Sequence, residues 1–501
     1  MSGPVMKSAS ETSERPVGSF SGDVFKLVSG ATFAQVLGVL AAPVLTRLFA
    51  PDAFGLMALF VSITAILGIV SCLRYEMAIP LPKKDGEAAA LLAACVVTVI
   101  AVSSLIAILV HLLGERAAGW LNAPAFATVQ WLLPVAVFLA GISQAFRYWN
   151  ARMQRFGRIS MAQAVNAASA TSLKLGAGWA GWTGGASLIS AVMAGQAVSA
   201  GMLGARIWRA EGAMIRLHAR FREAWPLLRR YRKFPLADVW GVLINTASWQ
   251  LPALLLASFF AQAVVGHYAL GLRVLQLPMA MLGSSLGQVY YQRISRAWMA
   301  GETLDRLTGD VFARLSAVSL FPCMLIALAG PELFGFVFGS AWREAGVYAQ
   351  ILSPWIFLWF ISSPLSMIYP ALGRQGLALI LNSAIFVTRF LALLIGGVRG
   401  DIYLALALFA GSGVVMYGIL TLQIMHLAGT SWRIAIRALA RPFGVAVPLA
   451  LILFGVQQLG VTDGVTVMAA GGTLAAYFVV VVRTDHELYE LLKKRIMGRA
   501  K

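Results

Sequence analysis

Three basic residues, Lys174, Arg273 and Arg389, lie inside long apolar stretches of the sequence. A cation at the centre of a bilayer costs about 2.5–3.5 kcal/mol unless it faces water or a partner. No acidic residue occupies the middle of such a stretch. Cations without acids favour an anionic ligand, and Lys and Arg can neutralise the oxygens of a lipid diphosphate. We therefore predict that these three residues bind such a substrate; the structural alternative is that each cation snorkels outward.

Neutral polar residues accompany the cations at helical spacing. Asn166 precedes Lys174 by eight residues and Asn382 precedes Arg389 by seven, which is about two helical turns in each case. Each half of the chain therefore has a polar stripe that ends in a cation. The other polar residues that we assign to the same cavity are Gln35, Asn245, Gln250 and Gln276. Hydrogen bonds between neighbouring helices are the alternative role for these amides.

The sequence gives no indication of a metal site or a cofactor. Cys72, Cys95 and Cys323 lie inside apolar stretches and lack the spacing of metal ligands. Residues 176–181 spell the dinucleotide motif G-x-G-x-x-G. They end an apolar stretch and follow no strand, so the structural context that the motif requires is missing. We expect no cofactor.

The composition predicts a membrane protein. Of the 501 residues, 59% are hydrophobic and 12% charged, and the mean hydropathy is +0.78. Soluble domains carry about 45–50% apolar and about 25% charged residues. A helix needs about 20 apolar residues to cross the bilayer. On that criterion the sequence predicts spans at 24–48, 53–73, 88–113, 127–148, 161–182, 186–208, 239–260, 264–290, 315–333, 347–369, 377–398, 402–425, 443–459 and 465–482.

The distribution of basic residues predicts the orientation. If the N-terminus is cytoplasmic, only Arg47, Arg116, Arg343 and Arg399 lie at the outer ends of spans, while nearly all other Lys and Arg residues lie on the inside. Both termini are therefore expected in the cytoplasm. The net charge of +19 then reflects topology and contact with anionic inner-leaflet lipids, and we expect no nucleic-acid partner.

An internal repeat divides the chain. Phe49-Ala50, followed by Gly55, matches Phe260-Ala261, followed by Gly266, at an offset of 211 residues. Six spans per half predict parallel repeats that enclose a central site. The predicted divisions are a polar cytoplasmic N-terminus (1–22), an N-lobe (23–208), a basic cytoplasmic connector (209–237), a C-lobe (238–426), two accessory spans (427–482) and a basic amphipathic tail (483–501).

Two stretches after the first and second spans, residues 47–55 (RLFAPDAFG) and 73–82 (LRYEMAIPLP), resemble the polysaccharide transporter family. These are the Wzx-type lipid-linked oligosaccharide flippases of the multidrug/oligosaccharidyl-lipid/polysaccharide exporter superfamily. Residues 231–235, 338–342 and 363–366 are also similar to family segments. The resemblance implies an all-α polytopic membrane protein, here with about 14 transmembrane helices, in which two six-helix lobes form a V around a cationic cavity and a C-terminal helix pair is added.

The function that the resemblance implies is transport. A bacterial inner-membrane flippase of this kind moves an undecaprenyl-diphosphate-linked oligosaccharide repeat unit from the cytoplasmic to the periplasmic leaflet by alternating access, for surface polysaccharide biosynthesis. Family flippases use basic cavity residues, which map best onto Lys174, Arg273 and Arg389. We assign a gate to Arg74 and Glu76 at the cytoplasmic mouth, together with Arg47 at the outer end of the first span; an ion pair that holds a helix end is the alternative role for Arg74 and Glu76.

Other functions are compatible with parts of the sequence. A peptidoglycan-precursor flippase or a MATE-like small-molecule exporter would keep the fold, although cationic drugs would meet Lys and Arg in the cavity. A membrane glycosyltransferase or polymerase is disfavoured because the outer loops are short, and we predict that the chain is not an enzyme. The expected partners are the polyprenyl-diphosphate-linked glycan, anionic inner-leaflet lipids and the polysaccharide polymerase and chain-length machinery.

Overall fold

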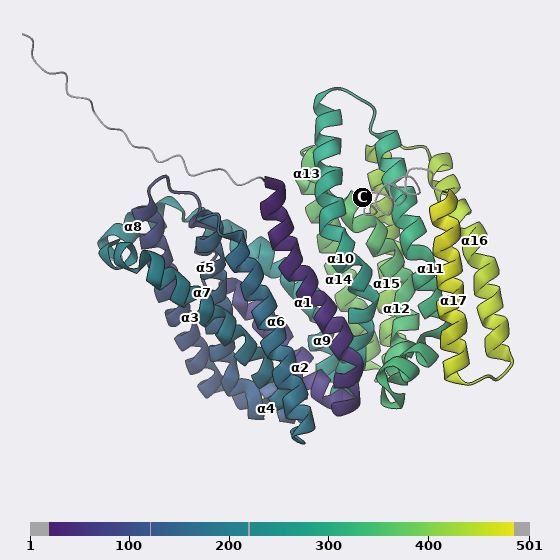
Figure 1. Cartoon of the computed structure of the whole chain (residues 1–501), viewed down its shortest axis with the longest axis horizontal. Coiled ribbons are helices and arrows are strands. Elements are labelled where there is room, and N and C mark those ends of the chain that lie inside the picture. The colour runs from purple at the N-terminus through teal and green to yellow at the C-terminus, as the bar shows by residue number, and fades with distance from the viewer. Residues whose placement is uncertain (1–19, 121, 219–220, 485–501) are drawn as a thin grey trace, which may run out of the picture.

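The computed structural model describes residues 20–484 except 121 and 219–220, and this part of the chain is helical throughout its regular elements (Figure 1). The first half contains α1 (Phe20–Leu48), α2 (Pro51–Val70), η1 (Tyr75–Ala78), α3 (Asp85–Trp120), α4 (Pro124–Val129), η2 (Gln130–Leu132), α5 (Leu133–Arg152), α6 (Phe156–Trp179), α7 (Gly185–His218) and α8 (Phe221–Arg230). The predictions for the N-terminal segment before residue 20 and for the tail from residue 485 lie outside the described residues.

The second half contains η3 (Phe234–Asp238), α9 (Val239–Phe259), α10 (Gln262–Met299), α11 (Asp305–Phe338), η4 (Ser340–Trp342), α12 (Arg343–Leu365), α13 (Ile368–Ala371), α14 (Gln375–Val398), α15 (Ile402–Leu427), α16 (Trp432–Gln458) and α17 (Asp463–Thr484). Among the residues that the structure describes, twelve candidate membrane spans are long and apolar enough to cross a bilayer. The two remaining long helices, α6 and α10, carry the predicted cations Lys174 and Arg273. The chain is therefore a polytopic, all-α membrane protein, as predicted.

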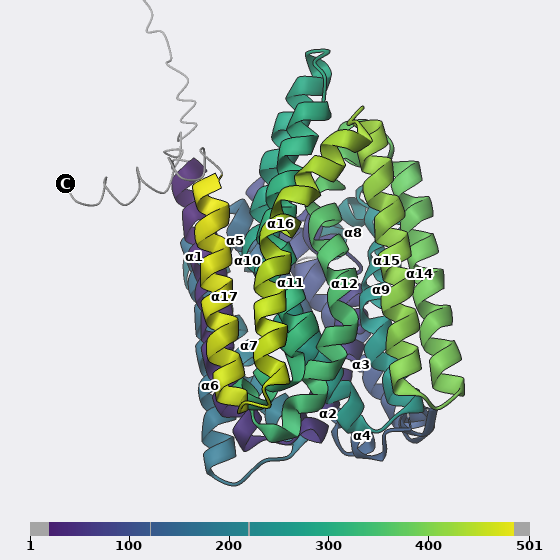
Figure 2. The ribbon, with the colours of Figure 1, turned by 90° about the vertical axis from the view of Figure 1, so that its right-hand side faces the viewer.

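The long helices pack in two groups, seen on the left and right of Figure 1. We call α1–α7 the N-lobe and α9–α15 the C-lobe. The helix α1 packs on α6 and lies on the side of the N-lobe that faces the C-lobe (Figure 1). We call the side at which α1 begins and α17 ends the terminal face; it is at the top of Figures 1 and 2. The side of the α1–α2 turn is the opposite face.

The lobes meet closely near the opposite face, and the repeated glycines make this contact. A Cβ atom on Gly55 of α2 would lie 1.9 Å from the backbone oxygen of Gln262, and one on Gly266 of α10 would lie 2.0 Å from the backbone oxygen of Pro51. Only glycine permits backbones to approach so closely. The matching sequence segments are therefore the points at which the two halves touch.

Buried aromatic residues extend this contact. Trp342, which is fully buried, donates its indole N–H to the backbone oxygen of Thr46 at 2.8 Å. Its ring packs edge-on against Phe54, with 5.0 Å between centroids. The indole thus joins the end of α1 to the C-lobe by both packing and a satisfied hydrogen bond.

The last two helices form a pair against α11, as Figure 2 shows for α16 and α17. Tyr477 stacks on Phe321 with 4.8 Å between ring centroids, and its hydroxyl donates to the backbone oxygen of Ala317 at 2.7 Å. At the opposite face Arg343 pairs with both Glu332 and Asp463. The helices α16 and α17 are therefore held against the C-lobe by ring stacking, a hydrogen bond and an ion pair.

Candidate substrate-binding site

Arg273 faces an accessible space beside α1. Protein atoms surround its guanidinium, yet the residue is exposed to solvent. It lies against α1, because a Cβ atom on Gly38 would be 2.8 Å from one of its terminal nitrogens. The Arg273 side chain therefore packs against α1 while part of it remains accessible.

Lys174 joins Arg273 from the other lobe. It is half-buried on α6, and its charge interacts unfavourably with that of Arg273. No acidic side chain among the described residues contributes to the electrostatics of either group. Two like charges near each other without a counter-ion attract an anion. Lys174 and Arg273, two of the three predicted cations, are thus near enough for their charges to interact.

The third predicted cation, Arg389 of α14, does not line an open cavity, and its placement there has to be corrected. The residue is 2% exposed. Its guanidinium lies between four aromatic rings and donates a hydrogen bond to the hydroxyl of Tyr417 at 3.0 Å. The ring centroids of Trp249, Trp355, Phe409 and Tyr417 lie 5.0–5.6 Å away. The negative faces of these rings, rather than a phosphate, stabilise the charge.

The predicted polar residues fall into different environments. Gln250 accepts a hydrogen bond from Ser62 at 3.0 Å and so bridges α9 and α2, which is the interhelical role. Asn382 is exposed and donates to the backbone oxygen of Ala378 on its own helix at 2.9 Å. Asn245 is exposed, whereas Gln35 and Gln276 are half-buried. Only Asn166 lines the pocket described next.

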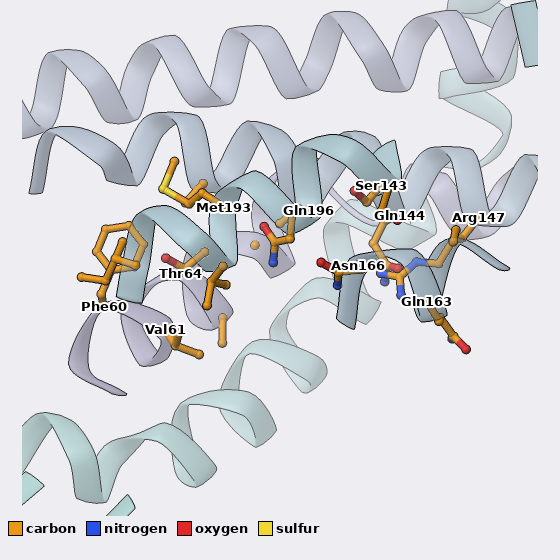
Figure 3. A pocket seen from close by; sticks show the side chains of 18 of the residues that line it. Phe60, Val61, Thr64, Ser143, Gln144, Arg147, Gln163, Asn166, Met193 and Gln196 are labelled. Carbon is orange, nitrogen blue, oxygen red and sulfur yellow. The ribbon is translucent and has the colours of Figure 1, made fainter. Parts of the chain in front are cut away.

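A pocket of about 400 Å³ lies within the N-lobe among α2, α5, α6 and α7. Five residues with long polar side chains or amides line it, namely Gln144, Arg147, Gln163, Asn166 and Gln196, and Figure 3 shows them together with the apolar Phe60, Val61 and Met193. The sequence analysis did not identify Arg147, because basic residues are expected at the cytoplasmic end of a predicted span for reasons of topology alone. The signal was the pairing of polar residues three apart, Gln144 with Arg147 and Gln163 with Asn166, on neighbouring helices.

The predicted gate residues lie on two sides of the molecule. At the terminal face Arg74 pairs with Asp238 at 2.8 Å and with Glu76 at 3.7 Å. Asp238 directly precedes α9, so the first ion pair joins the N-lobe to the start of the C-lobe. Glu76 is 3% exposed, and burial raises the pKa of its carboxyl group above the ordinary value of 4.5.

Arg47 lies on the opposite face. Its guanidinium donates to the backbone oxygens of Val337 at 2.7 Å and Phe336 at 3.1 Å, near the end of α11. The last carbonyls of a helix carry its partial negative charge and are a favourable site for a cation. Arg47 therefore ties α1 to the C-lobe where the lobes already touch, and Arg74 ties them on the other side.

Comparisons with known proteins identify a family from the sequence and a fold from the structure. The sequence profile of a family described as polysaccharide biosynthesis protein matches residues 44–346. The structure is similar to "Lipid II flippase MurJ, inward closed conformation", with a TM-score of 0.72 at 10% identity over 91% of this chain and 99% of that one. It is also similar to inward-facing and outward-facing structures of a multidrug resistance MATE family transporter of the MOP superfamily.

The MATE similarities have TM-scores of 0.60 and 0.54, each at 15% identity. They cover 81% and 83% of this chain and 96% of each transporter chain. No curated protein matches the chain by sequence. At these identities the similarities establish a common fold of membrane transporters, and the profile match over more than half of the chain establishes the family.

Proposed function

Because the chain belongs to the polysaccharide biosynthesis protein family, we propose that it is a flippase for an undecaprenyl-diphosphate-linked oligosaccharide repeat unit. The repeat unit moves from the cytoplasmic to the periplasmic leaflet of a bacterial inner membrane and then serves surface polysaccharide biosynthesis. Transport, rather than catalysis, fits the transporter fold that the chain shares with the compared structures.

The observation that carries this proposal is that Lys174 and the exposed Arg273, which lies against α1, are near enough for their charges to repel each other. A diphosphate carries the negative charge that this pair lacks, and an accessible space allows its sugars to remain hydrated while the polyprenyl chain stays in lipid. Arg389 is enclosed by rings and contributes to the stability of the C-lobe instead.

Alternating access is supported by the unequal contacts at the two faces. The opposite face is held by the Gly55–Gly266 crossing and by Trp342, whereas at the terminal face the ion pair of Arg74 with Asp238 joins the N-lobe to the start of the C-lobe. With the termini in the cytoplasm, the less tightly joined side is the one from which the substrate enters. If the close packing at one face breaks and similar packing forms at the other, the site becomes accessible from each leaflet in turn.

The basic connector supports contact with the inner leaflet. Trp225 of α8 is 50% exposed, and the guanidinium of Arg229 lies 6.0 Å from its ring centroid. An exposed aromatic residue beside basic ones is typical of a helix at the surface of an anionic membrane. The helix α8 also packs against α3, and the hydroxyl of Tyr75 donates to the backbone oxygen of Leu228 at 3.2 Å.

The test is to delete the gene and analyse the polyprenyl lipids. The proposal predicts that complete repeat units on polyprenyl diphosphate accumulate on the cytoplasmic face. Complementation with Lys174→Glu or Arg273→Glu should fail, while the exposed Arg399→Glu, a matched charge reversal, should restore export. Absence of accumulation would refute the proposal, and accumulation of a cell-wall precursor instead would identify a peptidoglycan-precursor flippase.

A further inference from the structure

The pocket inside the N-lobe is separate from the Lys174–Arg273 pair, since neither residue lines it. Its two ends have different chemistry. Figure 3 shows Phe60, Val61 and Met193 at one end, and Arg147 at the other, where its guanidinium extends toward Gln144 and Asn166. No acidic residue lines the pocket. A small ligand with a polar, negatively charged side would match this arrangement.

Several polar atoms at the charged end have no partner in the described part of the protein. Arg147 Nε, Ser143 Oγ and Gln163 Oε1 are buried and form no hydrogen bond. Proteins seldom leave such atoms unpaired, because the lost hydrogen bonds to water are not replaced. Three of them belong to residues that line one hollow, in which a bound molecule would supply their partners.

The types of side chain restrict the chemistry of that molecule. A guanidinium binds phosphate or carboxylate oxygens through charge-assisted hydrogen bonds. The side-chain amides of Gln144, Gln163, Asn166 and Gln196 each offer donors and an acceptor, as the hydroxyl groups of a sugar require. The volume of about 400 Å³ falls within the range of about 300–1,000 Å³ for small-molecule sites.

We propose that this pocket binds one hydroxylated sugar ring that carries a single anionic group, a phosphate or a carboxylate. The inference deepens the proposed function, on which the link to the transported glycan rests. The anionic sugar has two sources on such a substrate: an acidic sugar within the repeat unit, or the first sugar together with the phosphate that joins it to the diphosphate bridge. Both present the same chemistry to Arg147 and its neighbouring amides.

Calorimetric titration of the full chain, purified in detergent, tests the proposal with glucuronate, glucose 1-phosphate, glucose and inorganic phosphate as probes. We expect at least one anionic sugar to bind roughly tenfold more tightly than glucose, as expected for a hydrogen bond to a charged group. Preference for glucuronate assigns the pocket to an acidic sugar of the repeat, and preference for glucose 1-phosphate assigns it to the sugar phosphate.

Arg147→Gln should abolish the preference for the anionic sugar, whereas the exposed Arg374→Gln should preserve it. If Arg147→Gln does not yield folded protein, Gln196→Leu serves, and it should weaken the binding of every sugar. The proposal is overturned if no anionic sugar binds, if these variants bind as the wild type does, or if inorganic phosphate binds as tightly as the sugars. Failure of the proposed function would appear separately, in the lipid analysis of the deletion strain.

Discussion

The two lobes share a fold but fill their interiors differently. The N-lobe holds a pocket in which Arg147 lies among side-chain amides and several buried polar atoms have no partner. In the C-lobe Arg389 is packed between Trp249, Trp355, Phe409 and Tyr417. An intramembrane cation can thus be retained for a ligand or for packing. The environment of a cation, rather than its position in a repeat, therefore indicates its role.

The largest expected effect comes from reversing the charge in the C-lobe. Arg389→Glu would place a carboxylate against the negative faces of four rings, and an uncompensated buried charge destabilises by about 3–5 kcal/mol. We expect little folded protein in detergent, measured by size-exclusion chromatography and thermal unfolding. The same reversal at Lys174, which is half-buried beside the charge of Arg273, should leave folding intact and abolish export.

Arg389→Met separates charge from shape in that experiment. It keeps an unbranched side chain among the rings and loses mainly the cation–π attraction, about 0.5–2 kcal/mol. Its unfolding midpoint should lie between those of the wild type and Arg389→Glu. Normal folding of Arg389→Glu, or an equal loss of folding in Lys174→Glu, would remove the distinction between the lobes.

The next largest effect is expected at the contact between the two lobes, where their sequences match. Gly55→Ala and Gly266→Ala each introduce a Cβ atom within about 2 Å of a backbone oxygen, and overpacking of this kind costs about 1–3 kcal/mol. Both should lower the unfolding midpoint by similar amounts and reduce export. Gly241→Ala in α9 is the control, because no atom lies within 4 Å of the added carbon. A decrease in only one of the paired variants would show that the contact is not symmetric.

A smaller effect compares hydroxyl groups inside the two lobes. Thr64 Oγ1, beside the N-lobe pocket, is buried without a partner, so Thr64→Val should stabilise the protein by about 1 kcal/mol. Thr421 in the C-lobe donates to the backbone oxygen of Tyr417 at 2.7 Å, and Thr421→Val should destabilise by a similar amount. Thermal unfolding in one detergent measures both. If both variants change the unfolding midpoint in the same direction, the two hydroxyl groups do not differ in hydrogen bonding as the structure indicates.

Much of the fold could be predicted from the sequence, because fourteen apolar stretches correspond in order to fourteen long helices. Hydropathy is a local property, and the bilayer makes it decisive. The site was harder, since Lys174 and Arg389 look equivalent in the sequence. Only the convergence of α9, α12 and α15 around Arg389 distinguishes them, and that depends on tertiary packing. Arg147 was missed for the same reason, because its pocket is formed by residues from four helices.

The smallest expected effect is at the terminal face, where the N-lobe meets the start of α9. Burial raises the pKa of Glu76 above 4.5, so the folded state binds a proton more tightly than the unfolded state does. The contribution of Glu76 to stability is therefore fully present below its unfolded pKa, and it is lost as the pH rises through the raised folded pKa. Glu76→Gln should lack this decline, and the Arg74–Asp238 pair should remain.

Thermal unfolding of the wild type and Glu76→Gln between acidic and neutral pH measures the difference. The two curves should converge at acidic pH, and at neutral pH the variant should be at least as stable as the wild type. The exposed Glu302→Gln is the control, and its curve should follow that of the wild type. If Glu76→Gln is instead less stable at neutral pH, the charged carboxylate of Glu76 stabilises the fold through Arg74, and this ion pair adds to the pair of Arg74 with Asp238. In that case the difference in strength between the two faces, on which the direction of entry rests, would be smaller than the packing indicates.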